Sequence, residues 1–149
     1  MQTRWNINIK SNMGEPFLDT NIILRFLTGD HPEQQQRAKL FFERLERNEL
    51  QVTAPVTVIA DTVYVLSSPK FYNLPRVEIA ALLKPLLRLP AFQIRQRGVV
   101  LLALDLYGSH AIDFGDALII ASMKHAHSKT VYSFDQDFDG FEEIVRQEP

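Results

Sequence analysis

The chain has 149 residues, with 16 Lys and Arg against 18 Asp and Glu, so its formal net charge is −2. A length of this order favours a single domain, and a hydrophobic fraction of 46% argues against wholesale disorder. The absence of cysteine excludes disulfides, thiolate zinc sites and cysteine nucleophiles. The slightly acidic balance gives no overall basic field that would attract nucleic acid.

The chain carries no targeting or membrane signal. Residues 1–15 lack the apolar core of a signal peptide, and we expect them to form an N-terminal tail or extension before a single domain over residues 16–149. No stretch reaches the ~20 apolar residues of a membrane helix, because charged residues interrupt both Phe17–Leu27 and Leu82–Phe92. We therefore expect a soluble, cytoplasmic protein with no membrane segment.

Short β-prone runs alternate with helical periodicity. Strands are expected at Pro16–Asp19, Leu50–Ala54, Phe92–Arg95, Thr130–Phe134 and Glu143–Val145. Helices are expected at about Ile22–Leu27, Glu33–Arg47, Pro55–Leu66, Arg76–Leu89, Gly98–Tyr107 and Asp113–His125. Pro85 should kink the fourth helix or end it at Lys84. This alternation predicts βαβ units and an α/β fold, with a mainly parallel sheet covered on both faces.

Aspartates follow two of the expected strands. Asp19 ends the first strand and Asp135 follows Thr130–Phe134, so both should open on the same edge of the sheet, where ligands bind in such folds. Asp116 lies near the start of an apolar helix, and Asp61 lies within another. Each acid alone has an ordinary explanation as a helix cap, a first-turn residue, a turn former or a solvated side chain.

Together, the four acids predict a cation site. Like charges gathered at one sheet edge repel, and some would be protonated unless a cation neutralised them. A site made only of oxygen ligands suits Mg²⁺ or Mn²⁺. Because such ions activate water and stabilise the charge on a phosphoryl group, the pattern indicates phosphodiester hydrolysis.

Four segments around these acids occur in a fixed order. They are Phe17-Leu-Asp19-Thr-Asn21, Val58-Ile-Ala-Asp61, Asp113-Phe-Gly-Asp116 and Val131-Tyr-Ser-Phe-Asp135-Gln-Asp137. From Pro16 to Phe141 they resemble the motifs of PIN-domain nucleases, most closely those of the toxin ribonucleases of VapBC-type toxin–antitoxin pairs. The resemblance implies a three-layer α/β/α sandwich with a mainly parallel central sheet, and Mg²⁺- or Mn²⁺-dependent endonucleolytic cleavage of RNA.

The resemblance also implies the residues of the site and the partners of the protein. The acids Asp19, Asp61, Asp116 and Asp135 would be catalytic and would hold the metal, with Asp137 as a further ligand and Asn21 and Ser133 in supporting positions. The substrate would be RNA, and the partners would be a cognate antitoxin protein and a second copy of the chain.

Two positions depart from the family pattern. Asp61 stands where the family usually has Glu, and its side chain is one methylene shorter, so it would reach the metal only through water. This leaves open an alternative, a PIN-like RNA- or protein-binding module with weak or no catalysis. Ser133 replaces a usual Thr and retains the hydroxyl.

Other signals carry less weight. The run that begins at Asp135 matches half of a calcium-binding EF-hand loop, but its twelfth position is Arg146 and no helix precedes it. His125 and His127 would lie on roughly opposite faces of a helix and would not share an ion. An unrelated phosphatase would carry Asp-x-Asp after the first strand, whereas Thr and Asn follow Asp19.

Basic and aromatic residues offer only weak signals for contact with RNA. The candidates for phosphate contacts are Arg25, Lys39, Arg44, Lys70 and Arg76, and the candidates for stacking on a base are Phe71 and Tyr72. A solvated surface and core packing, respectively, are the more ordinary explanations.

Overall fold

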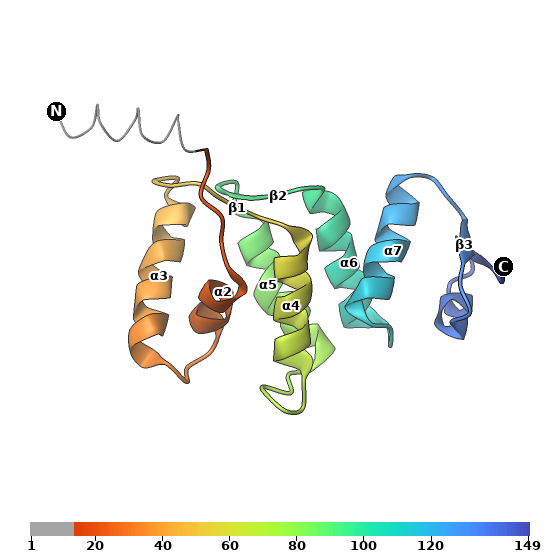
Figure 1. Ribbon diagram of the computed structural model, residues 1–149, viewed down its shortest axis with the longest axis horizontal. Helices are drawn as coiled ribbons and strands as arrows, with labels where there is room; N and C mark the ends of the chain where they lie inside the picture. The colour runs from red at the N-terminus through yellow and green to blue at the C-terminus, as the bar shows by residue number, and fades with distance from the viewer. Residues whose placement is uncertain (1–13) are drawn as a thin grey trace.

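The computed structural model describes residues 14–149 and shows an α/β protein of elongated shape (Figure 1). Most of the N-terminal extension expected over residues 1–15 therefore lies outside the described residues. The elements are, in chain order, α2 (Thr20–Leu27), α3 (Pro32–Glu46), β1 (Val52–Ala54), α4 (Val56–Ser67), α5 (Arg76–Leu87), β2 (Phe92–Ile94), α6 (Arg97–Ser109), α7 (Phe114–His125), β3 (Thr130–Tyr132), the 3₁₀ helix η1 (Gln136–Gly140) and β4 (Val145–Gln147).

All strand pairs among the described residues are parallel, as the alternation of elements predicts, but they form two separate sheets. In one sheet β1 pairs with β2, with Thr53 opposite Gln93. In the other β3 pairs with β4, with Val131 opposite Arg146. The single central sheet expected from the sequence is not formed by these residues. A strand of three residues is shorter than the four to eight residues over which an alternating pattern can be recognised, so the sequence offers little from which its partner could be predicted.

The first expected strand is also shorter than predicted. It is reduced to one parallel bridge from Phe17 to Thr53, flanked by hydrogen bonds from the Leu18 amide to the Thr53 carbonyl and from the Thr53 amide to the Pro16 carbonyl, each 2.9 Å. Leu18 is buried, but the Phe17 side chain is 74% exposed. The side chain of Phe17 therefore lies on the open side of the segment, although this residue opens the first apolar run of the chain.

Helix α5 runs through Pro85 to Leu87, so of the two expected effects of this proline, a kink or an end at Lys84, the end is wrong. Pro85 falls in the last turn of the helix. At that position the missing amide removes only the bond to the Ala81 carbonyl, and the chain leaves the helix before the lost bond affects a further turn.

The helices pack around one apolar core. Helix α6 lies between α5 and α7, while α2 packs against α3 and α4. The core runs from Leu18 to Phe141 and includes Phe138. The rings of His110 and Phe141 lie 4.8 Å apart between centroids. These contacts hold the C-terminal strands and η1 against the end of the α6–α7 pair.

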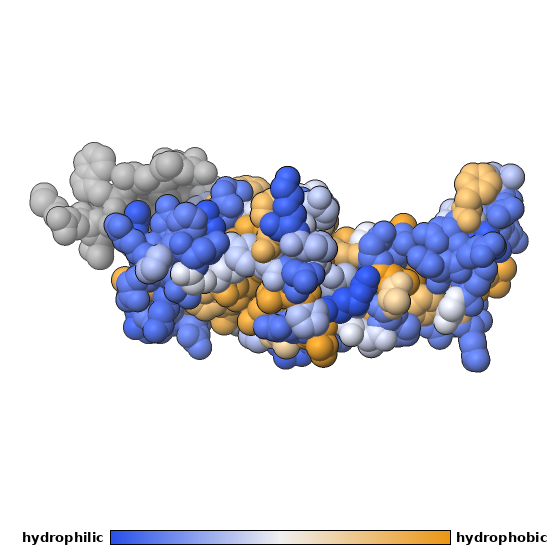
Figure 2. All heavy atoms as spheres, turned by 90° about the horizontal axis from the view of Figure 1, so that it is seen from below, coloured by the Kyte–Doolittle hydropathy of each residue, from blue (hydrophilic) through white to orange (hydrophobic). Residues whose placement is uncertain are grey.

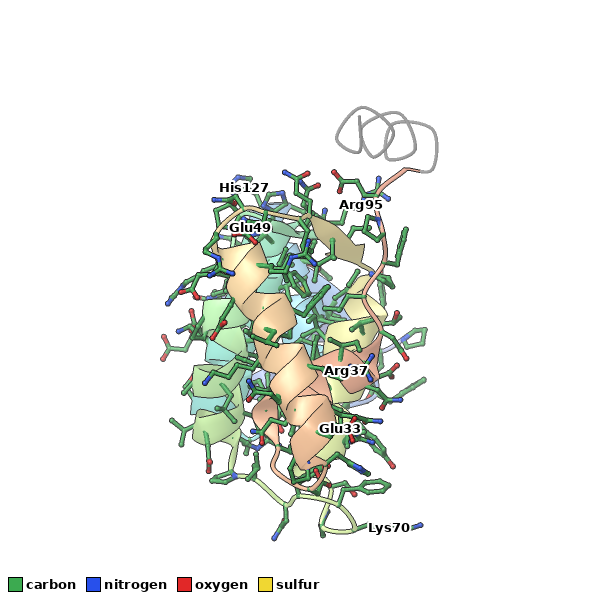
Figure 3. All side chains as sticks on the ribbon, turned by 90° about the vertical axis from the view of Figure 1, so that its left-hand side faces the viewer. Glu33, Arg37, Glu49, Lys70, Arg95 and His127 are labelled. Atoms are coloured by element: carbon green, nitrogen blue, oxygen red, sulfur yellow. The ribbon has the colours of Figure 1, made fainter. Side chains whose placement is uncertain are left out.

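Charged side chains cover the outer face of the helices. Glu33 and Arg37 project from α3, and Lys70 projects from the loop between α4 and α5 (Figure 3). Polar residues dominate the face shown in Figure 2, with apolar patches between them. Among the described residues, no helix combines the length and apolarity required to cross a membrane.

Candidate metal centre and adjoining cavities

Helix α7 begins with two acids that are fixed relative to each other. Asp113 is the N-cap of the helix, and one of its carboxylate oxygens accepts a hydrogen bond of 2.8 Å from the Asp116 amide. This bond satisfies one of the free amides of the first turn. Asp116 follows three residues after the cap, in the first turn, where the helix dipole favours negative charge.

The segment after β3 presents two further acids through a chain of local hydrogen bonds. The Ser133 hydroxyl accepts from the Asp135 amide at 2.9 Å, and the Asp135 carboxylate accepts from the Asp137 amide at 2.9 Å. Asp135 is thereby the N-cap of η1. The Arg146 guanidinium donates to the Ser133 carbonyl and pairs with Asp139, which ties this turn to β4.

These two elements bring three carboxylates together, and we call Asp116, Asp135 and Asp137 the acidic cluster. Each offers one oxygen atom that lies within 4.8 Å of the others, and no other such group of three metal-ligating side chains occurs in residues 14–149. The pKa of Asp116 is raised, first by burial of its carboxyl and then by the negative charges of Asp113, Asp135 and Asp137. The three carboxylates and the repulsion between them fit a hard divalent cation, which takes oxygen ligands.

Asp19 and Asp61 do not belong to the acidic cluster. Asp19 is exposed and caps α2, accepting from the Thr20 amide at 2.8 Å. Asp61 is exposed on α4. The expected common edge for Asp19 and Asp135 is absent because the two follow strands of different sheets, so the structure assembles only part of the expected site.

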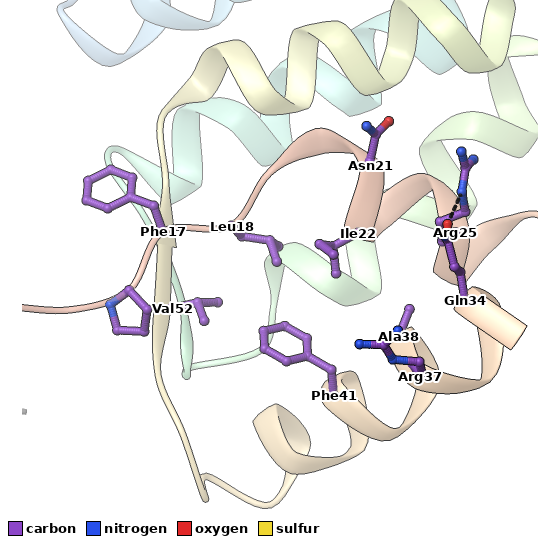
Figure 4. Close-up of a pocket in the computed structure, with 11 residues that line it drawn as sticks. Phe17, Leu18, Asn21, Ile22, Arg25, Gln34, Arg37, Ala38, Phe41 and Val52 are labelled. Atoms are coloured by element: carbon purple, nitrogen blue, oxygen red, sulfur yellow. Dashed lines mark hydrogen bonds between the residues drawn. The ribbon is translucent and has the colours of Figure 1, made fainter. Parts of the chain in front are cut away.

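A groove of about 650 Å³ lies beside the Phe17 segment, and Asn21 is one of its lining residues (Figure 4). Its floor is apolar, with Ile22 and Phe41 facing each other, while Arg37 lines its α3 side. Arg25 donates to the Gln34 side chain at 2.8 Å, and both residues line the groove.

A second cavity of about 660 Å³ adjoins the start of α7. It is lined by residues of α4, of the α4–α5 loop, of the start of α5, of the end of α6 and of the start of α7. These residues include Tyr64, Ser67, Arg76, Tyr107, Asp113 and Gly115. Asp113 thus belongs both to this cavity and to the cap that positions Asp116.

Arg76 fixes the segment that leads into α7. One of its terminal nitrogens, Nη1, donates to the carbonyls of Tyr107 and His110 at 3.4 and 3.3 Å and to the carbonyl of Ile112. Its guanidinium carbon lies 4.5 Å from the centre of the Tyr107 ring. Arg76 is therefore half-buried at the end of α6, where a cation is favoured by the helix dipole, rather than spread over a solvated surface.

The sequence did not show the structural roles of two residues that shape the centre. Asp113 entered the sequence analysis only as part of the third motif, although an acid three residues before Asp116 signals a second charge close to the first. For Arg76 no local pattern could show its three carbonyl partners, since these lie more than 30 residues away in the chain.

The structure also places the two histidines and the EF-hand-like run that the sequence analysis set aside. His125 and His127 are both exposed at the end of α7, and Figure 3 shows His127 at the rim of the molecule. The segment after Asp135 forms the 3₁₀ helix η1, and the ion pair of Arg146 with Asp139 ties this helix to β4.

An α/β scaffold that holds several acids at the start of one helix and after one strand is typical of metal-dependent nucleases. The model of the PIN domain family matches residues 17–144, and the chain belongs to this family. Over 121 residues it is 29% identical to a VapC ribonuclease of Aquifex aeolicus strain VF5, covering 81% of this chain and 87% of the relative.

Proposed function

We propose that the protein is a Mg²⁺- or Mn²⁺-dependent endoribonuclease and the toxin of a toxin–antitoxin pair. The observation that carries the proposal is the acidic cluster, in which Asp116, Asp135 and Asp137 present oxygen atoms within 4.8 Å of one another. Membership of the PIN family and the similarity to a VapC ribonuclease support an RNA substrate.

In this proposal the acidic cluster would hold the metal. Asp113 positions Asp116 through the capping bond, and Ser133 positions Asp135 by accepting from its amide. A bound divalent ion supplies positive charge opposite the phosphodiester and lowers the pKa of water. Without that ion, the like charges of the carboxylates would repel the phosphate.

We further propose that Asp19 and Asp61, with Asn21 in support, complete the site. These three residues stand at positions that match the motifs of the PIN family. The supporting observation is that Asp19, like Asp135, caps the helix that follows it.

The remaining proposals rest on membership of the PIN family and on the similarity to a VapC ribonuclease. We propose a PIN-like domain over residues 16–149 preceded by an extension, a cognate antitoxin protein as partner, self-association as a homodimer, and a cytoplasmic location. The VapC relative supports the toxin assignment through the ribonuclease activity in its name.

The test is RNA cleavage by Asp116→Asn. The wild type should cut single-stranded RNA when Mg²⁺ or Mn²⁺ is added and not in EDTA, and Asp116→Asn should lower the rate by at least about a hundredfold, as loss of one transition-state electrostatic group does. Asp105→Asn is the matched control, because Asp105 is exposed on α6 and pairs with Lys84 outside the cluster. Equal cleavage by wild type and a folded Asp116→Asn protein would refute the assignment.

A second candidate function is a PIN-like RNA- or protein-binding module with little catalysis. The position of Asp61 favours it, because this shorter acid lies outside the acidic cluster. Retained RNA binding without cleavage in both wild type and Asp61→Glu would support the module over the nuclease.

A further inference from the structure

We propose that the cavity beside α7 is a base subsite for single-stranded RNA, in which a nucleobase next to the cleaved phosphodiester stacks on Tyr64. We call it the Tyr64 cavity. The inference rests on the proposed function and names a contact for the substrate outside the acidic cluster.

The Tyr64 cavity has the size and the lining of a nucleotide site. Its volume of about 660 Å³ falls within the roughly 300–1,000 Å³ of pockets that bind small ligands. The lining combines apolar side chains with a few polar groups, among them Ser67, Arg76 and Asp113. Such groups can donate to and accept from the edges of a base, while the apolar walls contact its faces.

Tyr64 is the stacking surface. Its side chain lines the cavity yet is 69% exposed, so one face of the ring is free for a ligand. It lies on α4 three residues after Asp61, and residues at this spacing share one face of a helix. An exposed aromatic side chain beside charged site residues is a common way to hold an unstacked base.

The placement of the cavity connects it to the acidic cluster. Asp113 and Gly115 line the cavity, and the same Asp113 carboxylate accepts from the Asp116 amide at 2.8 Å. Helices α4 and α7 are in contact, and Figure 1 shows them with α6 in the central part of the molecule. A phosphodiester held at Asp116 would therefore place a flanking base at the mouth of the cavity.

Arg76 forms a positive wall without blocking the cavity. Its three hydrogen bonds to carbonyls all use Nη1, so these bonds leave Nε and Nη2 unused. The positive charge beside Asp113 offsets the repulsion between the acids and an incoming phosphate chain. Single-stranded RNA matches this combination, because duplex bases are already stacked and their faces are not available.

The first experiment measures binding without metal. Fluorescence anisotropy of a short fluorescein-labelled single-stranded RNA in EDTA is compared for wild type, Tyr64→Ala, Tyr64→Phe and Tyr132→Ala. Tyr132 is the matched control, being a tyrosine that is also 69% exposed but lies outside the lining. We expect Tyr64→Ala to weaken binding about tenfold, the effect of one base–aromatic stack, while Tyr64→Phe and Tyr132→Ala bind as the wild type does.

The second experiment identifies the position in the RNA whose base occupies the Tyr64 cavity. Cleavage by the wild type is measured on RNAs that lack one base at successive positions around the cut site, in the presence of Mn²⁺. One abasic position should slow the wild type about tenfold and leave Tyr64→Ala without further loss. Equal losses in both proteins, or equal effects of Tyr64→Ala and Tyr132→Ala on binding, overturn the base subsite while leaving the ribonuclease proposal intact. A wild type that neither binds nor cuts RNA overturns both.

Discussion

Replacing Asp116 with Asn should stabilise the metal-free protein, because it removes one charge from the acidic cluster. Two unit charges 4.8 Å apart, the upper limit for the cluster, repel by about 0.9 kcal/mol in water and about 3.5 kcal/mol at an effective dielectric constant of 20. Asp116 is only partly buried, so the value near the water limit applies. Loss of its repulsion with Asp135 and Asp137 then stabilises the fold by about 1–2 kcal/mol.

The assay is thermal unfolding in EDTA at neutral pH. For a domain of this size 1 kcal/mol shifts the melting temperature by about 2–4 °C, so Asp116→Asn should melt about 2–8 °C above the wild type. Asp105→Asn, which breaks the pair with Lys84 instead, should melt at or slightly below the wild type. A melting temperature for Asp116→Asn that does not exceed the wild-type value would show that the carboxylates do not repel in solution.

The same variant also tests how the stability of the protein depends on pH and on Mn²⁺. Because the pKa of Asp116 is raised in the folded protein, this carboxyl contributes most to folding stability at a pH below the ordinary pKa of an aspartate. The contribution is lost as the pH rises through the raised pKa. Added Mn²⁺ should reverse that loss in the wild type, since a ligand at a hundred times its dissociation constant adds about 2.7 kcal/mol. Both dependences should be weaker in Asp116→Asn.

Two further predictions concern positioning and reach. Arg76→Gln removes a charged donor from three carbonyls and should destabilise the protein by about 1.5–3 kcal/mol. It should also weaken Mn²⁺ binding, measured as a smaller rise of the melting temperature when Mn²⁺ is added. The control Arg95→Gln, at an exposed position (Figure 3), should change stability by less than about 0.5 kcal/mol. Asp61→Glu should raise the rate of RNA cleavage and Asp61→Asn should lower it in a single-turnover assay, whereas equal rates for the three proteins would place Asp61 outside the site.

The helices were predictable from local pattern because each depends mainly on its own residues. The apolar periodicity of α3 and α7 and the cap at Asp113 are written in consecutive positions, and the structure confirms them within a few residues. Pro85 shows the limit of a local rule: the cost of a proline depends on how many turns follow it, which its neighbours do not specify.

Pairing of the strands could not be predicted in the same way. Each strand has three residues. The sequence indicates that such a segment is extended, but it does not indicate which other strand it pairs with. The split into two sheets separates Asp19 from Asp135, which strand order alone had placed together. The members of the acidic cluster, Asp116, Asp135 and Asp137, were predictable from the sequence, but the absence of Asp19 and Asp61 from it was not, since this depends on how distant segments pack into the core.

The distribution of charge explains why overall composition was a poor guide to the proposed RNA substrate. Four negative charges lie at Asp113 and in the acidic cluster, so a net charge of −2 for the chain becomes +2 once these four are set aside. A divalent cation in the cluster would offset part of the local negative charge, and Arg76 adds positive charge on the wall of the Tyr64 cavity. An RNA strand approaching α7 would therefore meet a surface whose sign depends on the ion, so binding of intact RNA should be strengthened by divalent cations at constant ionic strength, as monovalent salt alone would weaken it.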